Sequence, residues 1–151
     1  MYENVLLPTD GSDESLRALD HALDIAGTYG ATLHALYVVD TSYPYGDLDG
    51  AAIDLQPVLQ ALREEGERTL RRIEGRAESA GTTFVGAVRE SGLVHRAILE
   101  YAEENDVDLI VMGTHGRRGL NRLLLGSVTE RVVRTADPPV LTVGGGAEAG
   151  E

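Results

Sequence analysis

The chain has 151 residues and a formal net charge of −12, and its 13 basic residues are all arginine. This length suits a single domain with a core large enough to fold unaided. The absence of cysteine excludes disulfides, thiolate metal sites and thiol nucleophiles, and the absence of lysine excludes Walker A loops, protein-kinase sites and Schiff-base chemistry.

The acidic composition also limits partners and location. A negative surface repels nucleic acid and anionic membranes, so we expect neither as a partner. No run of 18 apolar residues exists, and residues 1–4 lack the features of a secretory signal, so we expect a cytoplasmic protein. Acidity with arginine in place of lysine favours a halophilic origin, because screening within about 3 Å at 1 M salt removes self-repulsion. Ordinary acidity in a GC-rich genome is the alternative.

The first part of the chain alternates strand and helix signals. Residues 5–7 are apolar and end at Pro8-Thr9-Asp10-Gly11, which predicts a buried strand followed by a turn. Ser12 predicts the N-cap of a helix that ends at Gly30, and residues 33–39 predict a second strand. Alternation without hairpin turns is typical of a parallel sheet covered by helices.

The middle of the chain is predicted as a loop, two helices and two strands. Residues 41–54 contain Pro44, Gly46 and Gly50, which indicates a long irregular loop. The remaining elements are a helix over residues 55–80 with a solvated Glu and Arg face, a strand over 82–88, a helix from 94 to about 105 and a strand over 109–112.

A glycine-rich loop follows that last strand. Gly113, Gly116 and Gly119 have no Cβ, so the backbone there can take positive φ and let a ligand approach its N–H groups. Backbone N–H groups attract anions. The loop therefore predicts an anion site, with a flexible surface loop as the alternative.

A helix over residues 128–136 comes next, opened by Gly126-Ser127. Its dipole would point back at the glycine loop, and Val132, Val133 and Ala136 suit a core-facing side. The Ser127 hydroxyl has two interpretations. It either caps the helix by accepting from the Glu130 N–H, as in a capping box, or contacts a phosphate.

These elements predict an α/β fold with a single doubly wound five-stranded parallel sheet. We expect a Rossmann-like strand order of 3-2-1-4-5, with helices on both faces. In that order the loops after strands one and four meet at the switch point, which brings Asp10 to the Gly113 loop. The domain is predicted to span residues 1–143, followed by a disordered tail over residues 144–151.

The spacing Gly113-x2-Gly116-x9-Gly126-Ser127 resembles the nucleotide-binding signature of the universal stress protein family, in its ATP-binding branch. The resemblance extends from the opening Val5–Ser12 to the closing Pro138–Leu141. It implies a fold like that of the adenine nucleotide α-hydrolases. It also implies that ATP, AMP or ADP is bound, accompanied by magnesium.

The resemblance also implies which residues bind the nucleotide. Asp10 would contact the ribose hydroxyls or the magnesium on the phosphates, and an Asx-turn is its structural alternative. Val38 would contact adenine, with plain core packing as the alternative. The predicted nucleotide-binding residues are Pro8, Thr9, Asp10, Val38, Met112, Gly113, Gly116, Arg117, Gly126, Ser127 and Val128.

The charged residues near the loop are less specific. Arg117, Arg118 and Arg122 could offset triphosphate charge, or could simply be exposed loop arginines. His115 has no partner in the local sequence, so it is a weak candidate for a base. Because Glu130 would oppose an anion, we expect a divalent metal to accompany the phosphates.

The leading hypothesis is therefore an ATP-binding regulatory module of the stress response, with little or no hydrolysis. One alternative is a slow ATP-hydrolysing enzyme of the α-hydrolase type, although those enzymes carry a Ser-Gly-Gly-x-Asp-Ser loop where this chain has Thr9-Asp10-Gly11-Ser12-Asp13. Another alternative is a nucleotide-free interaction module. A homodimer is expected through the last strand, residues 140–143, which would form an uncharged sheet edge.

Overall fold

The computed structural model describes residues 1–42, 47–48, 51–52, 54–115 and 125–144. The elements there are β1 (Asn4–Thr9), α1 (Asp13–Tyr29), β2 (Thr32–Asp40), β3 (Asp47–Leu48), β4 (Ala51–Ala52), α2 (Gln56–Ser79), β5 (Phe84–Ser91), α3 (Val94–Glu104), β6 (Leu109–Gly113), α4 (Ser127–Thr135) and β7 (Val140–Val143). Each predicted strand and helix is present, with ends shifted by a few residues. None of the helices in these ranges is long and apolar enough to cross a membrane.

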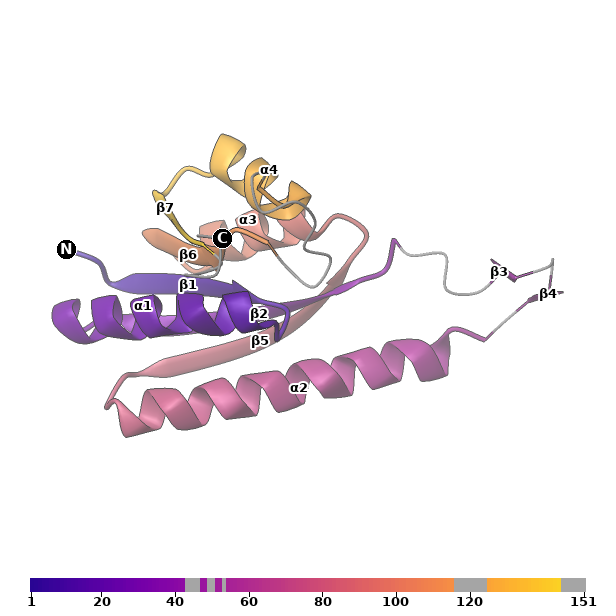
Figure 1. Cartoon of the computed structure of the whole chain (residues 1–151), viewed down its shortest axis with the longest axis horizontal. Coiled ribbons are helices and arrows are strands. Elements are labelled where there is room, and N and C mark those ends of the chain that lie inside the picture. Colours follow the sequence, from indigo (N-terminus) through magenta and orange to yellow (C-terminus); the bar gives the residue numbers. More distant parts are fainter. Residues whose placement is uncertain (43–46, 49–50, 53, 116–124, 145–151) are drawn as a thin grey trace, which may run out of the picture.

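The main sheet has the order β5-β2-β1-β6-β7, and its neighbouring strands are parallel. Numbered along the chain, these strands have the order 3-2-1-4-5, so the predicted topology is confirmed. Helices α1 and α2 cover one face, and α3 and α4 cover the other (Figure 1). β1 lies at the centre between β2 and β6, which explains its unbroken apolar run.

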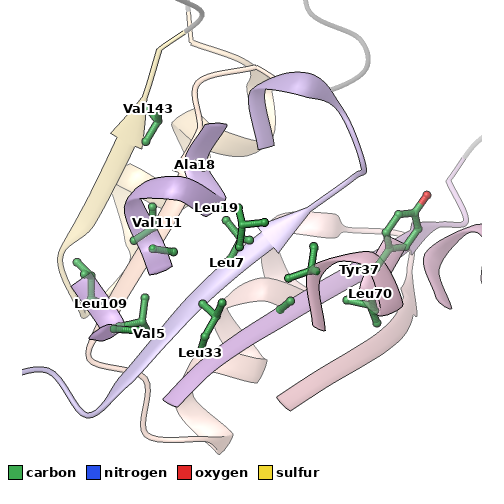
Figure 2. Packing of buried hydrophobic residues seen from close by; sticks show 14 of the residues in the cluster. Val5, Leu7, Ala18, Leu19, Leu33, Tyr37, Leu70, Leu109, Val111 and Val143 are labelled. Atoms are coloured by element: carbon green, nitrogen blue, oxygen red, sulfur yellow. The ribbon is translucent and has the colours of Figure 1, made fainter. Parts of the chain in front are cut away.

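The two faces of the sheet carry separate cores because side chains alternate along a strand. Val5 and Leu7 point to the face that α1 covers with Leu19, and all three side chains are fully buried (Figure 2). Leu6 points the other way, into a second cluster that includes Ile98 of α3. Every residue of β1 from Val5 onward is therefore buried on one face or the other.

The predicted ends of α1 are confirmed. Ser12 is the N-cap, and its hydroxyl accepts from the Ser15 N–H at 3.3 Å. Gly30 is the C-cap, with a left-handed φ of 66° that a residue without Cβ adopts at little cost. These caps orient α1 so that its first turn lies just beyond the end of β1.

The segment over residues 41–54 differs from the predicted irregular loop, because β3 and β4 pair there as a short antiparallel ladder. Strands of two residues carry too little periodicity to be seen in a sequence. The predicted tail over residues 144–151 lies outside the described residues, except for Gly144.

Candidate functional site

The carboxyl ends of β1 and β6 lie side by side at the centre of the sheet. The two strands pair through Val5 with Leu109 and Leu6 with Ile110. After β1 the chain continues into α1 on one face, and after β6 it leads to α4 on the other face. This divergence is the switch point where open α/β sheets bind ligands.

The turn after β1 is held by its own side chains. Asp10 Oδ1 accepts from the Ser12 N–H at 2.9 Å, so the Asx-turn interpretation of Asp10 is correct for one carboxylate oxygen. Thr9 Oγ1 accepts from the Gly11 N–H at 3.1 Å and lies 2.8 Å from Ser15 Oγ. Gly11 has a φ of 81°, which explains the glycine at this position. Asp10 and Thr9 are thereby fixed at the switch point.

The turn after β6 is tied to α1. Thr114 Oγ1 donates to Glu14 Oε2 at 3.1 Å, and the His115 N–H donates to the same oxygen at 3.0 Å. The Thr114 N–H donates to Val143 O at 3.0 Å. The N–H groups of Thr114 and His115 therefore already have protein acceptors, and the other glycines of the predicted anion loop, Gly116 and Gly119, lie outside the described residues.

Gly113 differs from the prediction that the glycines of this loop allow positive φ and close approach of a ligand. Gly113 does not have positive φ; the described glycines that do are Gly11, Gly30 and Gly81. A Cβ on Gly113 would lie 3.2 Å from Glu14 Cβ and 3.3 Å from the Glu14 backbone. Gly113 is thus required by the close approach of α1 to β6.

Helix α4 begins one residue earlier than predicted and lacks a capping box. Gly126 is the N-cap, and the Glu130 N–H donates to Gly126 O at 2.9 Å, so the proposed cap by Ser127 is wrong. Ser127 is instead the first residue of the helix. Thr129 is buried, and its hydroxyl donates to Gly113 O at 2.9 Å. The first turn of α4 therefore lies directly over the end of β6.

The core-facing side of α4 also differs from the prediction. Val132 is fully buried and Ala136 packs against the second cluster, but Val133 is 45% exposed. Val128, at the start of the helix, packs against the same cluster. The buried residues of α4 are Thr129 and Val132, which lie three positions apart on one side of the helix.

The first turn of α4 is the part of the site best suited to an anion. Its N–H groups at Ser127, Val128 and Thr129 lie at the positive end of the helix dipole, and Gly126 contributes no side-chain cap. Burial lowers the pKa of His95 of α3, and Arg131 of α4 and Arg96 of α3 are close enough to lower it further.

Three apolar residues of the predicted set occupy the same face of adjacent strands. Pro8 and Met112 are buried at the ends of β1 and β6, and Val38 is half-buried near the end of β2. Val38 and Met112 both belong to the cluster on the α3 and α4 face. Pro8 lies on that face too, since it is two residues after Leu6. Val38 therefore packs against the core, as its alternative interpretation predicts, but part of its surface is exposed.

Two of the predicted site residues, Gly116 and Arg117, lie outside the described residues, as do Arg118 and Arg122. Pro8, Thr9, Asp10, Met112, Gly113, Gly126, Ser127 and Val128 gather around the carboxyl ends of β1 and β6. Within the described ranges, no group of three or more His, Asp or Glu side chains could hold a metal ion by itself.

Sequence reasoning missed Glu14 as a site residue. Its carboxylate lies 3.7 Å from His115 Nδ1, so His115 does have an acidic neighbour. Glu14 and His115 are separated by 101 positions, and no local pattern connects them. Only the folded arrangement of α1 beside β6 reveals the pair.

Comparison with known proteins identifies the family. A sequence model described as the universal stress protein family matches residues 1–144. A universal stress protein of Methanocaldococcus jannaschii is 43% identical over 143 residues, which cover 95% of this chain and 82% of the relative.

Solved structures agree with this match. A universal stress family protein of Burkholderia pseudomallei superposes with a TM-score of 0.78 at 33% identity, over 95% of this chain and 97% of its own. A universal stress protein solved in complex with cAMP superposes with a TM-score of 0.66 at 30% identity, over 95% of this chain and 97% of its own. Because the family model matches nearly the whole sequence, the chain belongs to the universal stress protein family.

Proposed function

We propose that this chain is a regulatory module that binds an adenine nucleotide, in the first instance ATP, at the carboxyl edge of the sheet. The observation that carries the proposal is the position of α4: the Gly126 N–H donates to Thr114 O at 2.7 Å, which holds the first turn of the helix over the end of β6. The relative solved with cAMP supports the same ligand class. The proposed role is in the stress response, in the cytoplasm of a cell with high internal salt.

In this proposal the phosphates contact the first turn of α4. The N–H groups of Ser127 and Val128 and the Ser127 hydroxyl would donate to phosphate oxygens, because the dipole favours an anion at that end. Gly126 allows close approach since it has no side chain. Gly116 and Arg117 belong to the proposed site on the sequence pattern alone.

The nucleoside would lie between the ends of β1, β2 and β6. Asp10 is the proposed partner of the ribose hydroxyls, with Thr9 beside it, because Thr9 is the last residue of β1 and Asp10 follows it directly. Pro8, Val38 and Met112 would face adenine, since they share one face of three adjacent strands.

Magnesium is proposed to arrive with the phosphates. Glu130 lies in the first turn of α4 and Glu14 lies beside the loop, so an incoming anion meets negative charge on two sides. A divalent cation offsets this repulsion. Asp10 is the proposed carboxylate ligand, because Mg²⁺ prefers oxygen donors and usually takes one or two protein carboxylates.

Gly126→Asp tests the phosphate site. Gly126 has φ −63° and ψ 156°, the extended backbone of an N-cap aspartate, so the variant should fold with a better-capped α4. The new carboxylate would lie where the phosphates are proposed to bind. Calorimetry with ATP and magnesium should detect binding to the parent protein, and binding at least about 100-fold weaker to the variant, because like charges at a binding site cost several kcal/mol.

Gly144→Asp is the matched control. It adds the same charge at a glycine with open space around its Cβ, and it should bind ATP like the parent. Equal affinity in the parent, Gly126→Asp and Gly144→Asp would exclude the α4 site. A parent protein that binds no adenine nucleotide would favour the nucleotide-free interaction module.

Slow ATP hydrolysis is the second candidate function, because one observation favours it. Glu14 Oε2 lies 3.7 Å from His115 Nδ1, and a carboxylate can orient a histidine that acts as a base. We still expect turnover far below the roughly 10 s⁻¹ of typical enzymes, because nothing described orients an attacking water. A phosphate-release assay distinguishes the two functions: turnover near about one per second that disappears in Gly126→Asp would favour the enzyme.

We also propose that the protein forms a homodimer through β7. β7 pairs with β6 and lies at one end of the sheet order, so its other edge is available for pairing. Leu141 of this strand is 37% exposed. A two-fold axis beside β7 would cover this edge and the exposed leucine of both copies.

A further inference from the structure

Thr114 connects three elements of the fold through its three polar groups. Its N–H donates to Val143 O of β7 at 3.0 Å, and its carbonyl accepts from the Gly126 N–H at 2.7 Å. Its hydroxyl donates to Glu14 Oε2 of α1 at 3.1 Å. The position of Thr114 therefore sets the position of the α4 N-cap, and Glu14 holds the side chain of Thr114.

One oxygen of the Glu14 carboxylate accepts two hydrogen bonds. Oε2 accepts from Thr114 Oγ1 and from the His115 N–H at 3.0 Å, and it lies 3.7 Å from His115 Nδ1. The Glu14 side chain is 25% exposed and that of His115 is 7% exposed, so these contacts are shielded from water on most sides. Hydrogen bonds to a charged acceptor in such a setting are among the stronger ones in proteins.

The backbone around this contact leaves little room for movement. A Cβ on Gly113 would lie 3.2 Å from Glu14 Cβ, which shows how closely α1 approaches the end of β6. Glu14 also follows the capped start of α1, where Ser12 fixes the first turn. The carboxylate is therefore presented from a rigid element.

We propose that Glu14 is a positioning residue of the nucleotide site, which sets the N-terminus of α4 through Thr114 and Gly126. This inference rests on the proposed function. Glu14 need not contact the nucleotide: its carboxylate orders the turn after β6, and that turn holds the first turn of α4 in the geometry that phosphate oxygens require.

Removal of Glu14 has two opposing effects on ATP binding. The loss of a negative charge near the phosphates favours binding, whereas the loss of the ordered turn disfavours it. The second effect is the larger, because the donors around Oε2 already offset much of the carboxylate's field, while misaligned α4 donors lose their bonds to phosphate.

Calorimetry with ATP and magnesium on four proteins tests whether the loss of the ordered turn outweighs the loss of negative charge. Relative to the parent, Glu14→Ala should raise the Kd for ATP about tenfold or more, and Glu14→Gln should recover most of that loss because its amide oxygen still accepts. Asp13→Ala is the matched control. It removes the same charge from the same helical turn, and it should change the Kd less than about threefold.

Amide hydrogen exchange without nucleotide gives a second readout. The His115 N–H should exchange faster in Glu14→Ala than in the parent or in Asp13→Ala, because it loses its acceptor. Thr114→Val removes the same hydroxyl contact with little change in shape, and should also weaken ATP binding. It serves as the test if Glu14→Ala does not fold.

The possible results distinguish a failure of the positioning role of Glu14 from a failure of the proposed nucleotide binding. A parent protein without ATP affinity would refute the proposed function, and the nucleotide part of the inference with it. Unchanged exchange at His115 in Glu14→Ala would refute the positioning role whatever the parent binds. Equal or tighter ATP binding by Glu14→Ala, in a parent that does bind, would also overturn it.

Discussion

A buried histidine links three elements at the opposite end of the sheet from the candidate site. His34 of β2 is 6% exposed, with Nδ1 2.8 Å from Tyr101 OH and Nε2 3.0 Å from Asn4 Oδ1. These two contacts fit a neutral ring in which Tyr101 donates to Nδ1 and Nε2–H donates to Asn4. Burial lowers the pKa of His34 and raises the pKa of Tyr101. The folded protein therefore favours the uncharged form of both groups.

The lowered pKa of His34 makes folding stability depend on pH. The unfolded chain binds a proton near pH 6.5, whereas the folded protein binds it only at lower pH. The His34 contribution is therefore complete above pH 6.5 and is lost as the pH falls from there toward the folded pKa. Urea unfolding at about pH 7.5 and about pH 5.5 should show lower stability at the acidic value.

Two histidine variants test whether His34 causes this pH dependence of stability. His34→Gln should be less stable at both pH values, because it disturbs a buried network, but its stability should change less between them. Some dependence should remain, since the pKa of His95 is lowered as well. His21→Gln removes an exposed histidine and should keep the parent's dependence. Identical pH dependence in His34→Gln and the parent would contradict the assignment.

At the scale of an element, α2 packs against the sheet through a glycine. A Cβ on Gly66 would lie 2.7 Å from Tyr37 Cδ1 and 3.0 Å from Tyr37 Cγ, so the ring rests directly on the helix backbone. Both residues are buried, and Tyr37 belongs to the core cluster that α1 and α2 share. Gly66 is thus kept for packing in spite of its low helix propensity.

Gly66→Ala and Gly75→Ala should change stability in opposite directions. Alanine favours the helix by about 1 kcal/mol at either position, but at Gly66 the clash with Tyr37 costs roughly 1–3 kcal/mol, which is the larger effect. Gly75 is exposed, with open space around its Cβ, so only the gain applies there. Urea unfolding of both variants measures the difference. Equal stabilisation would mean that the Tyr37 ring moves aside without cost.

At the scale of the whole molecule, the proposed dimer can be tested by comparing substitutions on the two edge strands of the sheet. β7 and β5 are the edge strands, and each carries an exposed apolar side chain, Leu141 at 37% and Val85 at 41%. Leu141→Glu should give a monomer, because the two-fold axis would bring two like charges together in an apolar contact. Val85→Glu makes the same change in charge on the opposite edge and should leave the dimer intact.

Light scattering at micromolar protein concentration in high salt measures both variants and the parent. A monomeric parent would refute the dimer, and loss of the dimer in Val85→Glu instead would move the interface to β5. High salt is the appropriate condition, because a chain of net charge −12 repels a second copy when screening is weak.

The sequence by itself determined the layout of this protein. Apolar runs of strand length and helical periodicity are local signals, and right-handed crossovers leave few ways to arrange them, so the strand order and the helix caps at Ser12 and Gly30 could be predicted. The position of Asp10 at the same edge of the sheet as the end of β6 followed from that order, because carboxyl ends of neighbouring parallel strands share one edge.

Only the tertiary structure decided how the candidate site is held. Glu14 meets Thr114 and His115 across about 100 positions, and Gly113 is required by the approach of α1, two facts with no local signal. A capping box is one of the two sequence interpretations of Ser127, but in the structure Gly126 is the N-cap, and the Thr129 hydroxyl bonds to the end of β6. Contacts between distant segments depend on how helices pack on a finished sheet, and local periodicity carries no information about them.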